Sequence, residues 1–255
     1  MRPTVTRQAL LDACTELLQP ARFKDYGPNG LQVEGSDTIR HIVSGVTASR
    51  ALIEAAIDAK ADAIFVHHGL FWRGQDGTVT GWMKQRLQLL LAHNINVLAY
   101  HLPLDAHPEL GNNAQLGKRL GLQVQGTLGE QDLVLWGTAA NGQSFVNAHA
   151  LADVVSHALG RSPVVVQTPE REIRKVAWCT GGAQGYFDAA IAAGVDAFLT
   201  GEISEPQAHL ARETGVAFLA CGHHATERYG VKALGEWLYS EYGLDCEFVD
   251  IDNPA

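Results

Sequence analysis

Cysteine is scarce in this chain, and basic residues are fewer than acidic ones. The four cysteines (Cys14, Cys179, Cys221 and Cys246) show no C-x-x-C spacing, so we expect reduced thiols rather than a disulfide framework. No apolar run approaches the roughly 18–20 residues of a membrane span. With 19 basic and 28 acidic residues the formal net charge is −9, which argues against broad electrostatic wrapping of nucleic acid but not against a local basic patch.

The N-terminal segment also lacks the apolar core of a secretory signal. Met-Arg-Pro-Thr-Val-Thr-Arg leads into a mixed segment that contains Asp12 and Glu16. Together with the cysteine pattern, this favours a cytoplasmic location. The 255 residues, with 46% hydrophobic and 18% charged, are typical of a globular protein of one large or two modest domains.

Helical and extended patterns alternate along the first 100 residues. Thr6 is a candidate N-cap for a helix over 7–19. The following segments predict strands at 39–46, 63–66 and 95–100, separated by helices at 48–60 and 81–93. This β–α–β–α–β order is typical of an α/β fold with a mainly parallel sheet. Later in the chain we expect a helix over about 147–159, capped near Ser144 or Asn147, and a strand at 217–221.

Part of the pattern in the first half of the chain recurs in the second half. Residues 53–68 align without a gap with residues 187–202, so that Asp62 matches Asp196 and His68 falls opposite Glu202. Alanine-rich helices resemble one another by chance, which explains part of the match. Polar residues kept at corresponding strand ends favour an internal duplication of α/β halves. A turn-rich stretch at 126–130 predicts the boundary, giving domains at 1–126 and 127–255.

Two adjacent histidines end one of the predicted buried strands. The segment Ala63-Ile-Phe-Val-His-His-Gly69 places His67 and His68 where the strand stops. Neighbouring residues of a strand point to opposite faces, so both imidazoles can converge only because the backbone turns at Gly69. The alternative is a pair of hydrogen-bonded histidines beside an unrelated cleft.

A second pair of donors, His101 and Asp105, flanks Leu-Pro-Leu after the next strand. Pro103 disfavours a helix through the segment, so we expect a loop that aims Asp105 back toward the strand end. Asp105 could instead cap the helix that follows Asn112 and Asn113.

The third segment, Gly222-His-His-Ala-Thr-Glu227, follows the predicted strand at 217–221. A helix that begins near Ala225 would carry Val231, Leu234 and Leu238 on its buried face. His223 and Glu227 are four residues apart and share a face if both lie in the first turn. A buried glutamate without a partner is costly, so this geometry favours a bound cation; a frayed, solvated helix start is the alternative.

The carboxyl ends of parallel strands meet at one edge of a sheet, which favours convergence of these segments. The five candidate metal ligands are His67, His68, Asp105, His223 and Glu227. Five donors are too many for one zinc with an open position and suit two metals with a bridging carboxylate. Mixed imidazole and carboxylate ligands suit Zn, Fe, Mn, Co or Ni and disfavour Mg or Ca. Cys179 and Cys221 also lie near strand ends, where we expect buried packing.

With these residues identified, the chain resembles the dinuclear metal-centre family related to NGG-interacting factor three. The resemblance covers nearly the whole length. The motifs are YGPNGLQVEG (26–35), GVTAS (45–49), ADAIFVHHG (61–69), HLPLDAHPELGNNAQL (101–116), VAWCTGG (176–182), VDAFLTGE (195–202) and GHHATER (222–228).

The resemblance implies two interlocked α/β domains, with the metal site at strand ends between them and the helix over 225–242 returning to complete it. It also implies a toroidal homohexamer with two divalent metals per subunit, held by the five ligands named above. His101, Glu202 and His224 would then be residues around the metals or substrate. Family members are called GTP cyclohydrolase I type 2 homologs, and one bacterial branch is linked by name to DNA repair.

The leading functional hypothesis is a metal-dependent hydrolase of a nucleotide or phosphoester. Two cations would lower the pKa of a bridging water from about 15.7 toward neutrality, with His101 or Glu202 moving protons. Arg73 and Lys84 are candidate phosphate partners and Trp72 a stacking surface, although such residues in a glycine-rich loop more often serve packing. The alternatives are a non-catalytic ring that binds DNA, which the acidic charge disfavours, and a protein of metal storage or delivery.

Overall fold

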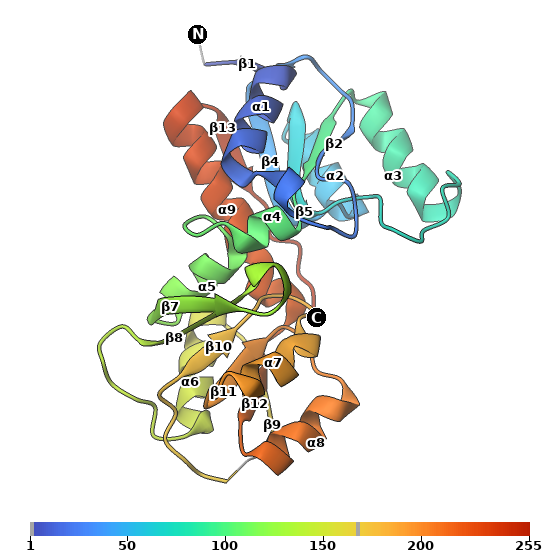
Figure 1. Ribbon diagram of the computed structural model, residues 1–255. Helices are drawn as coiled ribbons and strands as arrows, with labels where there is room; N and C mark the ends of the chain where they lie inside the picture. Colours follow the sequence, from blue (N-terminus) through green and yellow to red (C-terminus); the bar gives the residue numbers. More distant parts are fainter. Residues whose placement is uncertain (1–2, 167–168) are drawn as a thin grey trace. The chain divides into compact units, whose positions relative to one another are not determined.

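The structure, a computed structural model, describes residues 3–166 and 169–255. Its contacts divide the chain into two compact units (Figure 1). Unit 1 comprises Met1–Leu104 and Gly230–Asp252, and unit 2 comprises Asp105–Tyr229 and Asn253–Ala255. This division differs from the boundary expected at 126–130, because residues 126–128 belong to strand β7 (Leu122–Leu128), which pairs within the sheet of unit 2.

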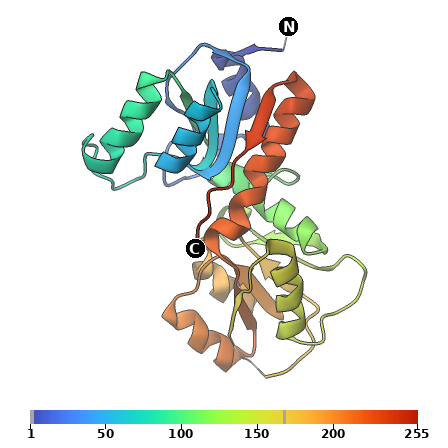
Figure 2. The same ribbon diagram turned by 180° about the vertical axis from the view of Figure 1, so that it is seen from behind.

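The sheet of unit 1 has five strands in the order β13-β4-β5-β6-β2. Their bounds are Asp245–Phe248, His41–Thr47, Ala63–His68, Asn96–Ala99 and Gly30–Val33. The pairs β13–β4, β4–β5 and β5–β6 are parallel, and β2 lies antiparallel on the edge beside β6. Strand β13 comes from the C-terminal end of the chain and lies beside β4 (Figure 2). The predicted parallel sheet is therefore confirmed.

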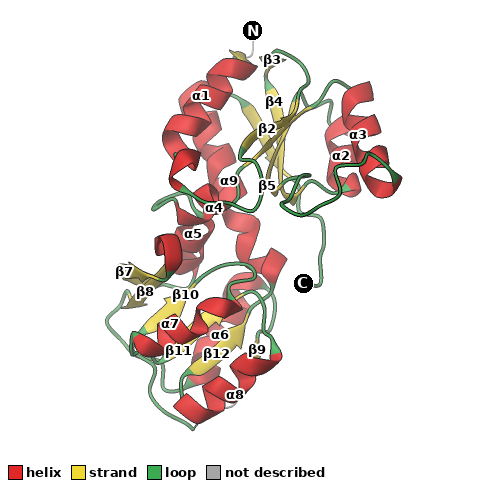
Figure 3. Cartoon of the chain, turned by 45° about the vertical axis from the view of Figure 1, so that its right-hand side comes forward, coloured by secondary structure: helices red, strands yellow, loops and turns green. Residues whose placement is uncertain are grey.

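Helices cover both faces of this sheet. Helices α2 (Arg50–Asp58) and α3 (Gly81–Ala92) pack on one face, and α1 (Arg7–Leu18) and the later part of α9 (His223–Tyr242) lie on the other (Figure 3). The predicted N-cap is confirmed, since the Thr6 side chain accepts from the Ala9 N–H. A short antiparallel pair, β1 (Val5–Thr6) and β3 (Thr38–Ile39), lies beside α1.

The sheet of unit 2 has six strands in the order β7-β8-β10-β11-β12-β9. The bounds of the last five are Val134–Ala139, Val176–Trp178, Ala197–Thr200, Ala217–Ala220 and Val164–Val166. The central pairs β10–β11 and β11–β12 are parallel, whereas β7, β8 and β9 join antiparallel. The carboxyl ends of three parallel strands therefore lie at one edge of this sheet.

Two pairs of helices enclose the sheet of unit 2. One face packs against α5 (Asn112–Arg119) and α6 (Ala148–Leu159), the latter capped by the Asn147 side chain as predicted. The other face carries Phe198 and Phe218, which contact Phe187 of α7 (Phe187–Ala192). Helix α8 (Glu205–Thr214) links β11 to β12. Apolar side chains thus fill both faces, which gives the strand ends a rigid base.

Asp62 and Asp196, matched in the sequence, make the same hydrogen bonds in the two units. Oδ2 of Asp62 accepts from the N–H groups of Arg40 and His41, immediately before and at the start of β4. Oδ2 of Asp196 accepts in the same way from Arg174 and Lys175, immediately before β10. These equivalent bonds support the predicted internal duplication.

The segment after His101 corrects one expectation. Residues Leu102–Ala106 form a short helix, α4, instead of the expected loop. Pro103 is the second residue of this helix, where its missing N–H would have no partner in the helix anyway. A proline in the first turn permits a helix that the same residue would break further along.

Candidate metal centre

Three histidines lie at the carboxyl ends of neighbouring parallel strands in unit 1. His67 and His68 are the last residues of β5, and His101 follows β6 by two residues. The ring centroids of His67 and His68 are 4.6 Å apart, and those of His67 and His101 are 4.9 Å apart. The three offer ligand nitrogens that all lie within 4.8 Å of one another. The sequence predicted that these strand ends converge, and the structure brings His101 into one cluster with His67 and His68.

Hydrogen bonds at Nδ1 orient these imidazoles. Nδ1 of the fully buried His67 lies 3.1 Å from the Tyr100 carbonyl oxygen. A carbonyl can only accept, so Nδ1 carries the proton and Nε2 of the neutral ring carries the lone pair. Nδ1 of His68 lies 3.2 Å from the Thr47 hydroxyl. Anchoring a histidine through one nitrogen so that the other can bind is the usual arrangement in metal sites.

His101 is anchored by a carboxylate that the sequence did not indicate. Its Nδ1 lies 2.7 Å from Oδ1 of Asp25, whose side chain is only 4% exposed. Burial by itself would raise the pKa of the Asp25 carboxyl, but hydrogen bonds and charge from His101, with hydrogen bonds from Asn29 and the Tyr26 N–H, hold the pKa below its usual value. Asp25 therefore stays ionised.

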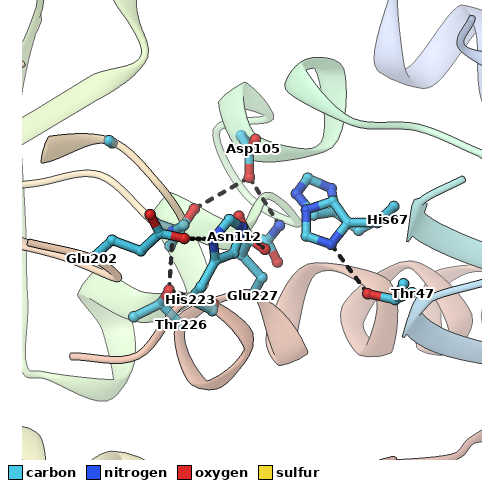
Figure 4. A network of polar contacts seen from close by, with 12 residues as sticks. Thr47, His67, Asp105, Asn112, Glu202, His223, Thr226 and Glu227 are labelled. Carbon is cyan, nitrogen blue, oxygen red and sulfur yellow. Dashed lines mark hydrogen bonds and ion pairs between the residues drawn. The ribbon is translucent and has the colours of Figure 1, made fainter. Parts of the chain in front are cut away.

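In unit 2 a histidine lies between two carboxylates. Helix α9 begins at His223, so His223 and Glu227 share a face of its first turns as expected. Glu227 is 2% exposed, and its Oε2 lies 3.1 Å from His223 Nε2. Nδ1 of His223 lies 2.6 Å from Oε1 of Glu202, which follows β11 by two residues (Figure 4).

The two carboxylates change the acidity of His223. Burial would lower the pKa of the imidazole, but Glu227 and Glu202 outweigh this effect and raise the pKa to about 9. Without a metal, the imidazole is a cation that pairs with both carboxylates. A divalent ion near Glu227 would supply the same positive charge.

Asp105 is a buried carboxylate of unit 2. Its Oδ1 accepts from the Asn112 side-chain amide at 2.9 Å and from the Thr180 hydroxyl at 3.2 Å. The alternative that Asp105 caps the following helix is wrong, because the N-cap of α5 is Gly111 and Asp105 contacts the side chain of Asn112. Both bonds orient the carboxylate, and Thr180 follows β10 at the same sheet edge as Glu202.

Gly181 brings the backbone against the carboxylate of Glu227. A Cβ atom at Gly181 would lie 2.0 Å from Glu227 Oε1 and 3.1 Å from His223 Nε2. The residue also has φ of +68°, which L side chains rarely adopt. The first glycine of VAWCTGG, Gly181, is therefore required because the backbone passes so close to these two side chains.

The remaining candidate residues from the sequence lie in different surroundings. Trp72 contacts His101 edge-on, with ring centroids 5.1 Å apart. Arg73 donates to the Asp25 carbonyl oxygen at 2.6 Å, a bond that ties two loops together, and Lys84 is exposed on α3. His224 is buried at 9% exposure.

The two cysteines near strand ends are buried as expected. Burial, together with the negative charges of Asp105 and Glu227, raises the pKa of the Cys179 thiol well above its usual value. Burial raises the pKa of the Cys221 thiol to about 12, although Arg161 opposes the effect. Both residues are therefore neutral thiols at pH 7, which agrees with a packing role.

Each unit thus offers ligands that fit a divalent transition metal. Unit 1 supplies imidazoles oriented through Nδ1, and unit 2 supplies a histidine and two buried carboxylates, Asp105 and Glu227. This mixture of nitrogen and oxygen donors is typical of Zn, Fe, Mn, Co and Ni sites. The fold and the donors define an α/β protein with a possible metal-binding site at its strand ends.

Comparison with known proteins identifies the family. Residues 5–254 match the family model Duf34/NIF3 (NGG1p interacting factor 3), and the chain belongs to this family. A protein of Neisseria meningitidis serogroup A, called a GTP cyclohydrolase 1 type 2 homolog, is 56% identical over 98% of this chain and 100% of its own length. A protein of the same description from Pseudomonas aeruginosa is 51% identical over 98% of this chain and 99% of its own.

Solved structures share the fold. Protein ybgI, described as of unknown function, is 49% identical, covers 98% of this chain and 100% of its own, and superimposes with a TM-score of 0.95. A protein from Thermus thermophilus is 32% identical with the same coverage and a TM-score of 0.88. The predicted fold class and family are both confirmed. Among the described residues, no helix is long and apolar enough to cross a membrane.

Proposed function

We propose that this protein is a metal-dependent hydrolase with two divalent ions per subunit. The proposed ligands are His67, His68, Asp105, His223 and Glu227. The observation that carries the proposal is the anchoring of His67 through Nδ1, beside His68 and His101, which leaves Nε2 as the nitrogen that can bind a metal. The buried carboxylates of unit 2, Asp105 and Glu227, support it, because carboxylate oxygens are common ligands of these metals.

Two of the proposed ligands lie near the points at which the chain passes from one unit to the other. The chain passes from unit 1 to unit 2 after Leu104 and returns after Tyr229. Asp105 is the first residue after one passage, and Glu227 is two residues before the other. These two donors therefore lie next to the chain crossings in the sequence.

His101 and Glu202 would move protons during the reaction. Two divalent ions, when bound, would supply Lewis-acid chemistry and would lower the pKa of a bound water. In the neutral form of the His101 ring the lone pair is on Nε2, because Nδ1 donates to Asp25. The Glu202 side chain is 46% exposed, so it can exchange protons with solvent. Both groups are adjacent to proposed ligands, which suits general acid–base catalysis.

A nucleotide or a related phosphoester is the proposed substrate class. The relatives' description as GTP cyclohydrolase 1 type 2 homologs supports a purine nucleotide. Trp72, with its ring against His101, offers an aromatic surface for a base. Because Arg73 already donates to Asp25, we do not assign it to a substrate phosphate.

A metal titration followed by an activity screen tests this proposal. We expect about two ions per chain by elemental analysis, and turnover of GTP or of a phosphoester with the native metal restored. His67→Ala should lose metal and activity, whereas His93→Ala should keep both, since His93 is exposed and bonds only its own helix. Metal-loaded protein that leaves GTP and a phosphoester panel unchanged would contradict a hydrolase.

We also propose a homohexamer, on the family resemblance alone. Light scattering after gel filtration should then give six times the 27.5 kDa mass of the chain. A monomer or dimer mass would overturn this part of the proposal without affecting the metal ligands.

A further inference from the structure

The carboxylate of Asp25 is surrounded by hydrogen-bond donors. Oδ1 lies 2.6 Å from the Tyr26 N and 2.7 Å from His101 Nδ1. Oδ2 lies 2.8 Å from the Asn29 amide nitrogen and 2.9 Å from the Leu102 N. Two of these donors are backbone N–H groups, one on each oxygen. Asp25 lies 76 residues before His101 in the sequence, so the contact depends on the tertiary fold.

This environment requires a charged carboxylate. Tyr26 N–H and Leu102 N–H can only donate, so an asparagine would place its NH₂ group against a backbone donor in either orientation. The carboxylate with both oxygens as acceptors satisfies all four donors. His101 must then donate from Nδ1, which leaves the lone pair of the neutral ring on Nε2.

Further contacts hold the imidazole ring in place. The His101 backbone N donates to the Asn29 side chain at 2.8 Å, and Trp72 lies edge-on against the ring. The ring centroid of His101 is 4.9 Å from that of His67 and 5.6 Å from that of His68. A ring anchored through Nδ1 by Asp25 thus presents its other nitrogen to the histidine cluster.

We propose that Asp25 is a positioning residue that fixes the protonated Nδ1 and the orientation of His101, so that Nε2 accepts a proton from the attacking water. This inference rests on the proposed hydrolase function. In the step, an O–H bond of the water breaks, its proton forms the Nε2–H bond, and the oxygen keeps the electron pair for attack on the substrate. The carboxylate stabilises the resulting imidazolium, which then returns the proton to the leaving group.

The protonation pattern of His101 can be measured without any activity. In wild-type protein with isotope-labelled imidazole nitrogens, we expect long-range NMR spectra near pH 8 to assign the His101 proton to Nδ1. Loss of one signal in His101→Gln identifies the residue among the 11 histidines. A neutral ring with its proton on Nε2 would overturn the proposal, whether or not the protein proves to be a hydrolase.

Asp25→Asn tests the role in turnover. We expect the Nδ1–H form of His101 to be lost and kcat to fall by about 10²–10⁴-fold, with KM and metal content within about twofold of wild type. Asp62→Asn is the matched control, because Asp62 is an acid of the same unit whose side chain binds two backbone N–H groups but no imidazole ring. A normal kcat in folded Asp25→Asn would contradict the inference. If that variant does not fold, the wild-type spectrum still decides.

Discussion

Asp62 and Asp196 hold equivalent turns of the two units with the same pair of backbone hydrogen bonds. In each case one carboxylate oxygen accepts from two consecutive N–H groups at the start of a central strand. The same two residues align in the sequence repeat, and His68 aligns with Glu202. The matched aspartates thus have the same structural role in both units, whereas the matched strand-end residues differ, being histidine in unit 1 and glutamate in unit 2.

Removing either structural aspartate should destabilise the protein. Asp62→Ala and Asp196→Ala each leave two backbone N–H groups without their acceptor, which should cost about 1–3 kcal/mol in unfolding free energy. Urea unfolding monitored by circular dichroism measures the loss. Asp153→Ala, at an exposed position of α6, should change stability by less than about 0.5 kcal/mol. If all three variants are equally stable, water replaces the lost carboxylate as acceptor for these N–H groups without a cost in unfolding free energy.

Gly181→Ala should impair metal binding beyond its backbone strain. The new Cβ would displace the Glu227 carboxylate. We therefore expect metal affinity to fall at least about tenfold, as is typical when a group that orients a metal ligand is lost. Gly194→Ala is the control, because Gly194 has the same φ of +68° and no atom within 4 Å of an added Cβ. Isothermal titration compares the two variants. If both bind metal as wild type does, Glu227 is not a ligand.

The buried thiol of Cys14 should make stability fall in alkali. Burial, aided by Cys246, raises the pKa of Cys14 from 9.0 to about 12. Above pH 9 the unfolded chain releases this proton while the folded chain keeps it, so stability decreases as pH rises. The expected contribution is about 1.4 kcal/mol per pH unit between pH 9 and 12. Denaturant midpoints at several pH values under reducing conditions, compared with Cys14→Ala, isolate the effect. Parallel pH profiles for the two proteins would contradict it.

Metal removal should lower thermal stability. A ligand that binds only the folded state adds about 2.7 kcal/mol at one hundred times its Kd, so chelation should lower Tm and re-addition should restore it. His67→Ala should lose this response and His93→Ala should retain it. If Tm does not change in wild-type protein that is known to have lost its metal, the metal either binds weakly or binds the folded and unfolded states equally well.

Periodicity and capping chemistry predicted most elements because they are local. The Thr6 and Asn147 caps and the central parallel strands required only neighbouring residues. The His67–His68 cluster was also predictable, since the sequence places both at the end of one buried strand. Helix α4 was missed because Pro103 disfavours a helix in general but not in its first turn.

Asp25 could not be predicted from one sequence. An aspartate just before Tyr-Gly-Pro-Asn-Gly is most simply interpreted as part of a turn. Its partner is 76 residues away, and only the pairing of β2 with β6 brings the two segments of unit 1 together. The sequence offered two local signals, the many turn residues in 25–30 and a histidine after a predicted strand. Neither signal indicates that Asp25 and His101 are partners.

Anomalous diffraction from crystals of the metal-loaded protein tests the central claim most directly. Data collected at the absorption edge of the native metal should give two peaks per chain, within a few Å of each other, as in two-metal sites. The peaks should be bound by Nε2 of His67, His68 and His223 and by the carboxylates of Asp105 and Glu227. No peak, or peaks bound by other residues, would contradict the proposed metal centre.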